Sequence, residues 1–149
     1  MAPVDYVVVG AGSAGCVLAN RLTEDPSIRV LLIEAGGRDR HPNIKIPAGF
    51  AKQFHTKLDW DYATEPEPHC DGRSLFIPRG KALGGSSSMN AMLYVRGRPL
   101  DYDLWEAEGA AGWGWDDVRP YVLKAENNER GASEHHAIGG PLNVMDERS

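Results

Sequence analysis

Three glycines at positions 10, 12 and 15 form a G-x-G-x-x-G motif, and Glu34 follows 19 residues after the last of them. This spacing is typical of a dinucleotide site. The first glycine permits a tight turn, the second lets a pyrophosphate approach the backbone, and the third allows close packing of helix on strand. Backbone N–H groups at the start of the next helix would bind the phosphates, and Glu34 would accept hydrogen bonds from the adenosine ribose. A carboxylate there would repel a 2′-phosphate, which disfavours NADP, whereas FAD and NAD both remain open.

A strand–helix–strand unit must position these residues. The apolar run "DYVVV" (5–9) predicts a buried parallel strand, and "RVLLIE" (29–34) predicts a second strand that ends at Glu34. Between them, Ala14, Val17, Leu18 and Leu22 fall on one face of a predicted helix. The alternative is a tight βαβ turn that binds nothing, but the motif, its flanking elements and the acid together favour the dinucleotide site.

The remaining sequence does not continue this pattern. No third long β-branched run follows Glu34, although a complete doubly wound sheet needs further strand–helix units. Short apolar pieces stand at 74–77 and 91–95. Helices are expected over about 100–108 and from about 116, with Pro120 in the first turn of the second, and a short strand is expected at 141–145. We therefore expect the chain to be the opening portion, a fragment, of a larger fold.

Composition excludes several classes of protein. The 149 residues amount to about one domain, and a net charge of −5 without a basic run argues against nucleic acid or an anionic membrane as partner. No signal peptide is recognisable, and no stretch approaches the ~18 apolar residues that span a bilayer. Two scattered cysteines, Cys16 and Cys70, form neither a disulfide framework nor a zinc site. A cytoplasmic protein is the default expectation.

A second glycine-rich stretch, "GKALGGSSSMN" (80–90), invites comparison with a phosphate-binding P-loop. That interpretation fails, because Leu75 occupies the place of the first glycine and Ala82 follows Lys81 where Ser or Thr is required. A flexible linker would not need apolar neighbours such as Leu83 and Met89. The segment is therefore predicted to fold against a flat, partly apolar partner.

The segment "GKALGGSSSMNAMLYVRGRPLDYD" (80–103) resembles the signature of the glucose-methanol-choline (GMC) family of flavin oxidoreductases. "DYVVVGAGSAGCVLANRL" and "VLLIEAGGRD" resemble the FAD-binding segment of that family. "WEAEGAAGWGWDDVRPY" and "GGPLNV" follow in the family's order, so the similarity spans essentially the whole chain. It is closest to choline dehydrogenases, alcohol dehydrogenases and aryl-alcohol oxidases.

The resemblance implies an α/β fold: the Rossmann-like βαβ start of a GMC-type FAD-binding domain, with the α+β substrate domain largely missing. Within the N-terminal portion 1–149, it implies a βαβ dinucleotide unit (1–37) and a loop or lid excursion (38–78). A flavin-contacting signature (79–103) follows, and then helices that lead into the next region (104–149).

The resemblance also implies which residues bind FAD. The first glycine loop would hold the pyrophosphate, Glu34 the ribose, and the signature the flavin ring, because its small residues let the backbone lie against a planar cofactor. Some members attach FAD through a histidine just before the signature; Arg79 stands there, so we expect non-covalent FAD. The predicted cofactor-binding residues are Gly10, Gly12, Ser13, Ala14, Gly15, Glu34, Ala35, Trp60, Arg79, Leu83, Gly84, Gly85, Ser86, Asn90, Ala91, Met92, Leu93 and Val95.

The chemistry implied by the resemblance is oxidation of an alcohol, in which a histidine base takes the hydroxyl proton while a hydride passes to flavin N5. That histidine lies near the C-terminus of family members. We therefore expect no catalytic residue and no metal site in this chain, a small alcohol as substrate, and a second polypeptide with the C-terminal part of the enzyme as partner. The alternatives are a non-catalytic dinucleotide-binding or assembly module and an NAD-linked enzyme. The signature argues against the latter.

The other chemically suggestive residues have simpler interpretations. The side chains of adjacent His135 and His136 diverge, so they are not predicted to form a metal or base pair. Asp116-Asp117 is predicted to cap a helix, and Trp60 to reach the cofactor or a lid. Surface positions are expected for His41, His55 and His69, and core or interface positions for Trp105, Trp113 and Trp115.

Overall fold

The computed structural model describes residues 3–146. The chain divides into two compact units at the Leu93–Tyr94 bond, which falls within the predicted signature segment 79–103. Each unit is described by itself.

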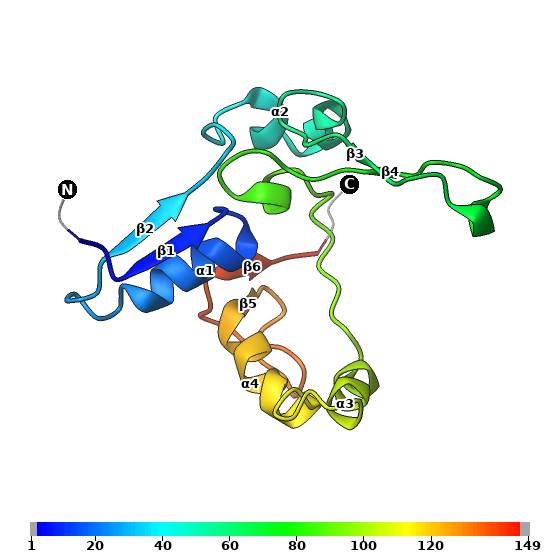
Figure 1. Cartoon of the computed structure of the whole chain (residues 1–149). Helices are drawn as coiled ribbons and strands as arrows, with labels where there is room; N and C mark the ends of the chain where they lie inside the picture. The colour runs from blue at the N-terminus through cyan, green and yellow to red at the C-terminus, as the bar shows by residue number, and fades with distance from the viewer. Residues whose placement is uncertain (1–2, 147–149) are drawn as a thin grey trace. The chain divides into compact units, whose positions relative to one another are not determined.

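The first unit opens with the predicted strand–helix–strand motif (Figure 1). Strand β1 (Tyr6–Val9) leads into helix α1 (Ser13–Leu22), and strand β2 (Val30–Ile33) lies parallel to β1. The register pairs Tyr6 with Val30 and Val9 with Ile33. The prediction is confirmed at all three elements, because apolar periodicity and glycine turns are local properties of the sequence.

One face of this two-stranded sheet is bare. Helix α1 covers the face that carries Val8, which is buried. Because side chains alternate along a strand, the opposite face carries Val7, Val9, Leu31 and Ile33, and all four are exposed, Val9 at 81%. Parallel sheets are normally covered on both faces. The bare apolar face agrees with the expectation that this sheet belongs to a larger fold.

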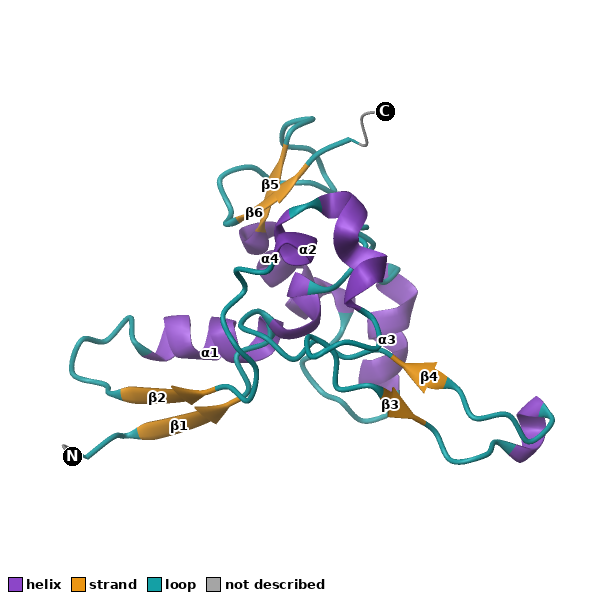
Figure 2. Cartoon of the chain, turned by 90° about the horizontal axis from the view of Figure 1, so that it is seen from above, coloured by secondary structure: helices purple, strands orange, loops and turns teal. Residues whose placement is uncertain are grey.

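The remainder of the first unit consists of short elements and loops. Helix α2 (Pro42–Lys45) and the 3-10 helix η1 (Pro47–Gln53) precede an antiparallel pair, β3 (Tyr62–Ala63) with β4 (Phe76–Ile77). This pair forms an arm that carries the 3-10 helix η2 (Pro68–Cys70) at its tip (Figure 2). A third 3-10 helix, η3 (Gly85–Ser88), lies in the signature segment.

The two short apolar pieces adopt different local structures. The run at 74–77 is a strand only at 76–77, and the run at 91–95 is neither helix nor strand. At its start, the side-chain oxygen of Asn90 accepts a hydrogen bond from the N–H of Met92 at 2.9 Å. Met92 has a φ of 59°. A local turn of this kind competes with extended structure, which agrees with the absence of a strand at 91–95.

The second unit contains helices α3 (Pro99–Ala107) and α4 (Trp115–Ala125), as predicted. Strand β5 (Glu126–Asn128) follows and pairs in parallel with β6 (Leu142–Val144). The sequence predicts β6 but not β5, because "ENN" has no apolar residue. Two of its three residues, Glu126 and Asn128, are nevertheless buried. Asn128 donates to Glu126, and the carboxylate also bonds with the N–H of Ala137 and with His136.

The start of α4 corrects two expectations. Gly114 is the N-cap, and the orphan N–H of Trp115 donates to the carboxylate of Asp103 at 2.9 Å. Asp116 and Asp117 therefore occupy the first turn and do not cap the helix, although their charge still suits its positive end. Pro120 lies inside the helix beyond its first turn.

The tryptophans of the second unit cluster around Tyr102. The Tyr102 ring centroid lies 5.3 Å from that of Trp105 and 5.5 Å from that of Trp115. Trp113 extends the group, 6.3 Å from Trp105. Trp105 and Trp113 are both exposed, so a core position is wrong for these two within the unit, and an interface role stays a prediction.

Candidate functional site

The first glycine loop has the geometry that a close ligand approach requires. Gly10 adopts a φ of 94°, which favours glycine, and Gly12 is the N-cap of α1 without a capping side chain. A Cβ on Gly15 would lie 1.9 Å from the carbonyl oxygen of Gly10, whereas a Cβ on Gly12 would meet nothing closer than 3.9 Å. Gly15 is therefore demanded by packing within the protein, and Gly12 leaves open space at the end of the helix.

Glu34 fixes the turns at the ends of both strands. One carboxylate oxygen accepts a hydrogen bond from the N–H of Ala11 at 2.7 Å, and the other accepts from the N–H of Gly36 at 2.8 Å. Each carboxylate oxygen has capacity for a further donor. The acid can therefore hold the loop and still accept a hydroxyl of a bound sugar.

The second glycine-rich stretch packs directly against the first. The N–H of Gly84 donates to the carbonyl of Ala11 at 2.8 Å, and the hydroxyls of Ser13 and Ser87 are hydrogen-bonded. A Cβ on Gly85 would lie 2.8 Å from Cα of Gly12. The sequence interpretation, in which these small residues accommodate a flat cofactor, is therefore incomplete: at Gly85 the close partner is backbone of the first loop.

Together the two loops border a pocket of about 620 Å³, within the range of small-molecule and cofactor sites. Eleven of the eighteen predicted cofactor-binding residues line it: Gly10, Gly12, Ser13, Ala14, Gly15, Glu34, Ala35, Trp60, Arg79, Gly85 and Ser86. Three further lining residues, Val9, Ile33 and Gly80, were missed. Val9 and Ile33 directly precede Gly10 and Glu34 at the carboxyl ends of the strands, and this position could have identified them.

Seven predicted residues lie outside this lining: Leu83, Gly84, Asn90, Ala91, Met92, Leu93 and Val95. Gly84 supports the site through its bond to Ala11, and the N–H of Leu83 donates to Gly37 at 2.9 Å. Leu93 and Val95 are largely exposed, and Val95 belongs to the second unit. Their cofactor contacts stay predictions.

Buried Asp59 organises the loop that places Trp60 at the pocket. Its carboxylate accepts hydrogen bonds from the N–H groups of His55, Asp61 and Arg79 at 3.2, 3.0 and 2.9 Å. Burial raises the pKa of Asp59, but these three donors outweigh burial and hold it below its usual value. His55 and Asp61 both adopt a φ of 56°, and the bonds to Asp59 stabilise this uncommon conformation.

Trp60 and Arg79 meet at the wall of the pocket. The N–H of Trp60 donates to the carbonyl of Arg79 at 2.8 Å. The Trp60 ring stacks on Tyr62 with centroids 5.7 Å apart, and the ammonium of Lys81 lies 4.4 Å from the centroid of the Trp60 ring. The predicted approach of Trp60 to the candidate site thus has a structural basis, although neither it nor Arg79 is close to the glycine motif in sequence.

The pocket residues fit a dinucleotide. Helix α1 begins at Ser13 with unpaired backbone N–H groups and a positive dipole end, which suit a pyrophosphate. Gly12 carries no side chain that would block its approach, and Glu34 stands at the end of β2 to accept ribose hydroxyls. No group of three or more His, Cys, Asp or Glu residues in 3–146 is arranged to hold a metal ion.

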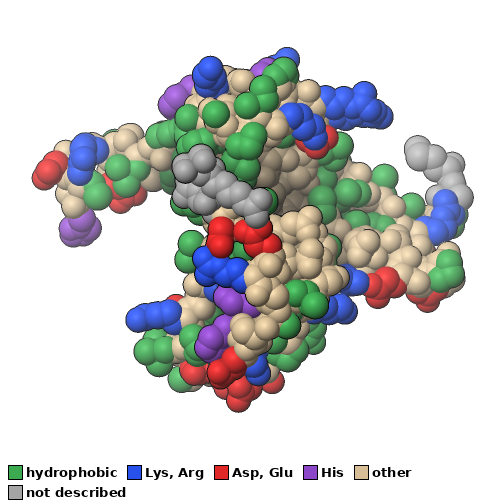
Figure 3. All heavy atoms as spheres, turned by 180° about the vertical axis from the view of Figure 1, so that it is seen from behind, with side chains coloured by type: hydrophobic (Ala, Val, Ile, Leu, Met, Phe, Trp, Pro, Cys, Tyr) green, Lys and Arg blue, Asp and Glu red, His purple; other side chains and the backbone are tan. Residues whose placement is uncertain are grey.

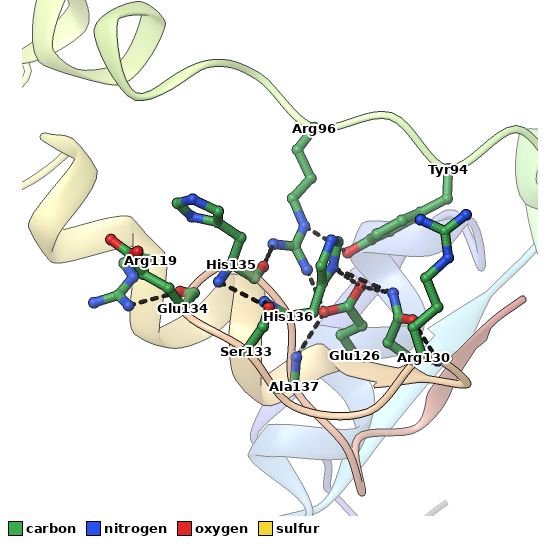
Figure 4. Close-up of polar contacts among 11 residues, drawn as sticks. Tyr94, Arg96, Arg119, Glu126, Arg130, Ser133, Glu134, His135, His136 and Ala137 are labelled. Carbon is green, nitrogen blue, oxygen red and sulfur yellow. Dashed lines mark hydrogen bonds and ion pairs between the residues drawn. The ribbon is translucent and has the colours of Figure 1, made fainter.

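A second polar cluster lies in the other unit, around the fully buried Glu126 (Figure 4). One carboxylate oxygen lies 3.0 Å from both Nδ2 of Asn128 and Nδ1 of His136. The other accepts from the N–H of Ala137 at 2.9 Å and lies 2.5 Å from Nη2 of Arg96. Burial raises the pKa of Glu126, but the bonds from Asn128, Ala137, His136 and Arg96 outweigh it and lower the pKa to about 2.

This cluster fastens the loop between β5 and β6. Arg96 donates to the carbonyl of His135, and Arg119 donates to that of Glu134 at 2.8 Å. The rings of His135 and His136 point in different directions in Figure 4. The arrangement is that of a structural network, in which hydrogen bonds and the ion pair with Arg96 surround a buried carboxylate.

Among the described residues, no helix has both the length and the apolar character needed to cross a bilayer.

Comparison with known proteins agrees with this geometry. The sequence profile described as GMC oxidoreductase matches residues 4–149. The alcohol dehydrogenase [acceptor] of Pseudomonas putida is 53% identical over 144 residues, which cover 95% of this chain and 26% of that protein. The chain spans about a quarter of the length of the curated relatives it matches.

Two solved structures share the fold. The pyridoxine 4-oxidase from Mesorbium loti matches with a TM-score of 0.88 and 43% identity, covering 95% of this chain and 28% of that one. An FAD-dependent oxidoreductase from Chaetomium thermophilum matches with a TM-score of 0.84 and 31% identity, covering 96% and 26%. The chain therefore has the α/β fold of the N-terminal, FAD-binding portion of these enzymes.

Proposed function

The chain belongs to the GMC oxidoreductase family, and we propose that it is the FAD-binding portion of an enzyme that oxidises a small alcohol. FAD, when bound, supplies the acceptor for a hydride from the CH–OH carbon. This chain's residues bind and orient the cofactor without a covalent bond.

The observation that carries the proposal is the meeting of the two glycine-rich loops beside Glu34. The N–H groups at the start of α1 would bind the pyrophosphate, and the carboxylate of Glu34, fixed by Ala11 and Gly36, would bind the ribose. Trp60 and Arg79 would form a further part of the pocket wall. The similarity to FAD-dependent structures supports the same assignment.

The substrate and the catalytic base come from the family resemblance. The alcohol dehydrogenase of P. putida is named for an alcohol, and an alcohol is the substrate class we propose here. The base, a histidine near the C-terminus of family members, would be supplied by a second polypeptide or a further part of the same enzyme. That partner would also cover the bare face of the β1–β2 sheet.

The second candidate function is a non-catalytic dinucleotide-binding or assembly module. It is favoured by the absence, within residues 3–146, of a titratable side chain other than Glu34 and Arg79 in the pocket lining. The two functions differ in whether alcohol turnover appears once the missing portion is supplied.

The test is a denaturing intact-mass spectrum of the purified material, which reads both polypeptides and released cofactor. A free FAD mass together with a second, larger chain, followed by alcohol-dependent reduction of a dye acceptor, is the expected result. FAD without alcohol turnover in the completed complex would favour the binding module. The absence of both FAD and turnover would overturn the proposal.

A further inference from the structure

A second, smaller cavity lies in the first unit, next to the candidate dinucleotide pocket. Its volume is about 300 Å³, enough for a small ligand. We call it the basic pocket and define it by its lining residues: Gly37, Arg38, His41, Lys57, Leu58 and Lys81.

Backbone contacts between three chain segments build its walls. The N–H of Lys81 donates to the carbonyl of Leu58 at 2.7 Å, and the N–H of Leu83 donates to that of Gly37 at 2.9 Å. A Cβ on Gly36 would lie 2.1 Å from the carbonyl oxygen of Lys81, so these two segments are in direct backbone contact. Leu58, which is buried, contributes an apolar surface. The cavity is therefore held by fixed backbone, while the charges are carried by side chains that reach it.

The residues that line this cavity carry a net positive charge, whereas the whole chain carries a net negative charge. The basic pocket has three cationic side chains, those of Arg38, Lys57 and Lys81, and no carboxylate in its lining. Residues 37–58 contain five Lys or Arg and one Asp, although the whole chain has a net charge of −5. Lys, Arg and His side chains gather over the α2–η1 region at the top of Figure 3.

Asp39, the one acidic residue of the segment 37–58, forms an ion pair outside the cavity. Asp39 accepts a hydrogen bond from Lys45 at 2.7 Å, and Lys45 does not line the cavity. Among the carboxylates of residues 3–146, none forms an ion pair with Arg38, Lys57 or Lys81. Like charges gathered without an acid repel one another, and an anion between them relieves that repulsion.

His41 adds an imidazole donor to the same cavity. Its Nδ1 accepts a hydrogen bond from the N–H of Asn43 at 3.2 Å. In the neutral ring the proton is therefore on Nε2, which is a donor. The basic pocket thus offers guanidinium, ammonium and imidazole donors, a set that matches the acceptor oxygens of a phosphoryl group.

Lys81 links the basic pocket to the candidate cofactor pocket. Its ammonium lies 4.4 Å from the ring centroid of Trp60, and Trp60 lines the larger pocket. An anion that attracts Lys81 changes the environment of the Trp60 ring, and this gives binding an optical signal.

We propose that the basic pocket binds a small oxyanion of the phosphate type, either inorganic phosphate or the phosphoryl group of a phosphate ester, at a site separate from the dinucleotide pocket. Arg38, Lys57 and Lys81 neutralise the charge, and Nε2 of His41 donates a hydrogen bond. The proposal does not depend on the proposed oxidation of an alcohol.

The test is a titration of the full 149-residue chain with inorganic phosphate at constant ionic strength, followed by calorimetry and tryptophan fluorescence. We expect saturable binding of one phosphate per chain. Lys57→Gln and Arg38→Gln should each weaken it at least roughly tenfold, as expected for loss of a charge-assisted hydrogen bond. The control Lys52→Gln removes a cation of the same segment that does not line the cavity, and should change the affinity little.

Each of three outcomes would overturn the proposal. The first is the absence of saturable phosphate binding. The second is an equal loss of affinity in Lys52→Gln, which would indicate diffuse electrostatic attraction, and the third is loss of phosphate binding in saturating FAD, which would assign the pocket to the dinucleotide. The fluorescence change should disappear in Trp60→Phe while the calorimetric signal persists. Phosphate is titrated first in the absence of FAD. If FAD then fails to bind, the proposed function fails while the phosphate result still stands. Titration with a phosphate monoester in parallel distinguishes the two sources of the phosphoryl group.

Discussion

The carboxylate of Glu34, at the end of β2, accepts a 2.7 Å hydrogen bond from the backbone N–H of Ala11, in the turn that follows β1. The acid that the sequence assigns to ribose recognition is therefore also part of the scaffold that shapes the glycine loop. A substitution at this position acts on the loop and on the ligand at once.

Glu34→Ala should weaken FAD binding roughly ten- to a hundredfold, because hydrogen bonds to a charged group contribute about 1.5–3 kcal/mol. Flavin content after gel filtration measures the effect. Glu24→Ala is the control, since Glu24, just beyond α1, pairs with Arg21 at the protein surface. Unchanged flavin content in Glu34→Ala would contradict the ribose role.

Two glycines of the same motif should respond differently to substitution by alanine. Gly15→Ala places Cβ 1.9 Å from the carbonyl of Gly10, so it should destabilise the βαβ unit itself. Gly12→Ala meets nothing closer than 3.9 Å, so it should leave the fold intact and weaken FAD binding by obstructing the pyrophosphate. Circular dichroism melts and FAD titration separate the two effects. Equal melting temperatures for both variants would refute the assignment of Gly15 to packing.

Glu126 should make the stability of the second unit depend on acid pH. Its pKa in the folded state is about 2, below the ordinary value of 4.5, so the carboxylate stabilises the folded state above about pH 4.5. That stabilisation, roughly 3 kcal/mol for a shift of this size, should be lost progressively as the pH falls from about 4.5 toward 2. Urea unfolding in a Trp60→Phe background follows the tryptophans of the second unit.

Glu126→Gln tests this assignment. It should lower the urea midpoint at pH 7 and flatten its dependence on pH between 5 and 3, whereas the surface variant Glu108→Gln should behave as wild type. If wild type and Glu126→Gln lose stability in parallel over this interval, another group governs the acid transition.

The bare face of the β1–β2 sheet should drive association. Val7→Lys places a charge among Val9, Leu31 and Ile33, so it should reduce self-association of the chain and prevent assembly with the remaining part of the enzyme. Light scattering during gel filtration measures both the self-association of the chain and its assembly with the remaining part of the enzyme. Ile138→Lys changes an exposed aliphatic residue in the other unit and serves as the control. An equal effect of the two substitutions would mean that general hydrophobicity, and not this face, governs association.

Much of the first unit follows from the sequence alone. The strand at 6–9, the helix at 13–22 and the strand at 30–33 are encoded by apolar periodicity and by glycines whose backbone freedom is a local property. The same holds for the helices of the second unit. Where a tertiary contact decides, the prediction fails: the sequence predicts that Asp116-Asp117 caps α4, but Gly114 is the N-cap and Asp103 accepts from the N–H of Trp115.

Only the tertiary structure decided how the distant segments meet. The contact of Gly84 with Ala11 and the approach of Gly85 to Gly12 join loops more than seventy residues apart, and no periodicity encodes such a pairing. The polar strand at Glu126 is buried because Arg96, His136 and Ala137 arrive from other segments to satisfy its carboxylate. The sequence thus determined which residue types were available for binding, since turns and helices depend on near neighbours. Folding decided which of them share a pocket, because burial and hydrogen-bond satisfaction depend on groups that are close only in space.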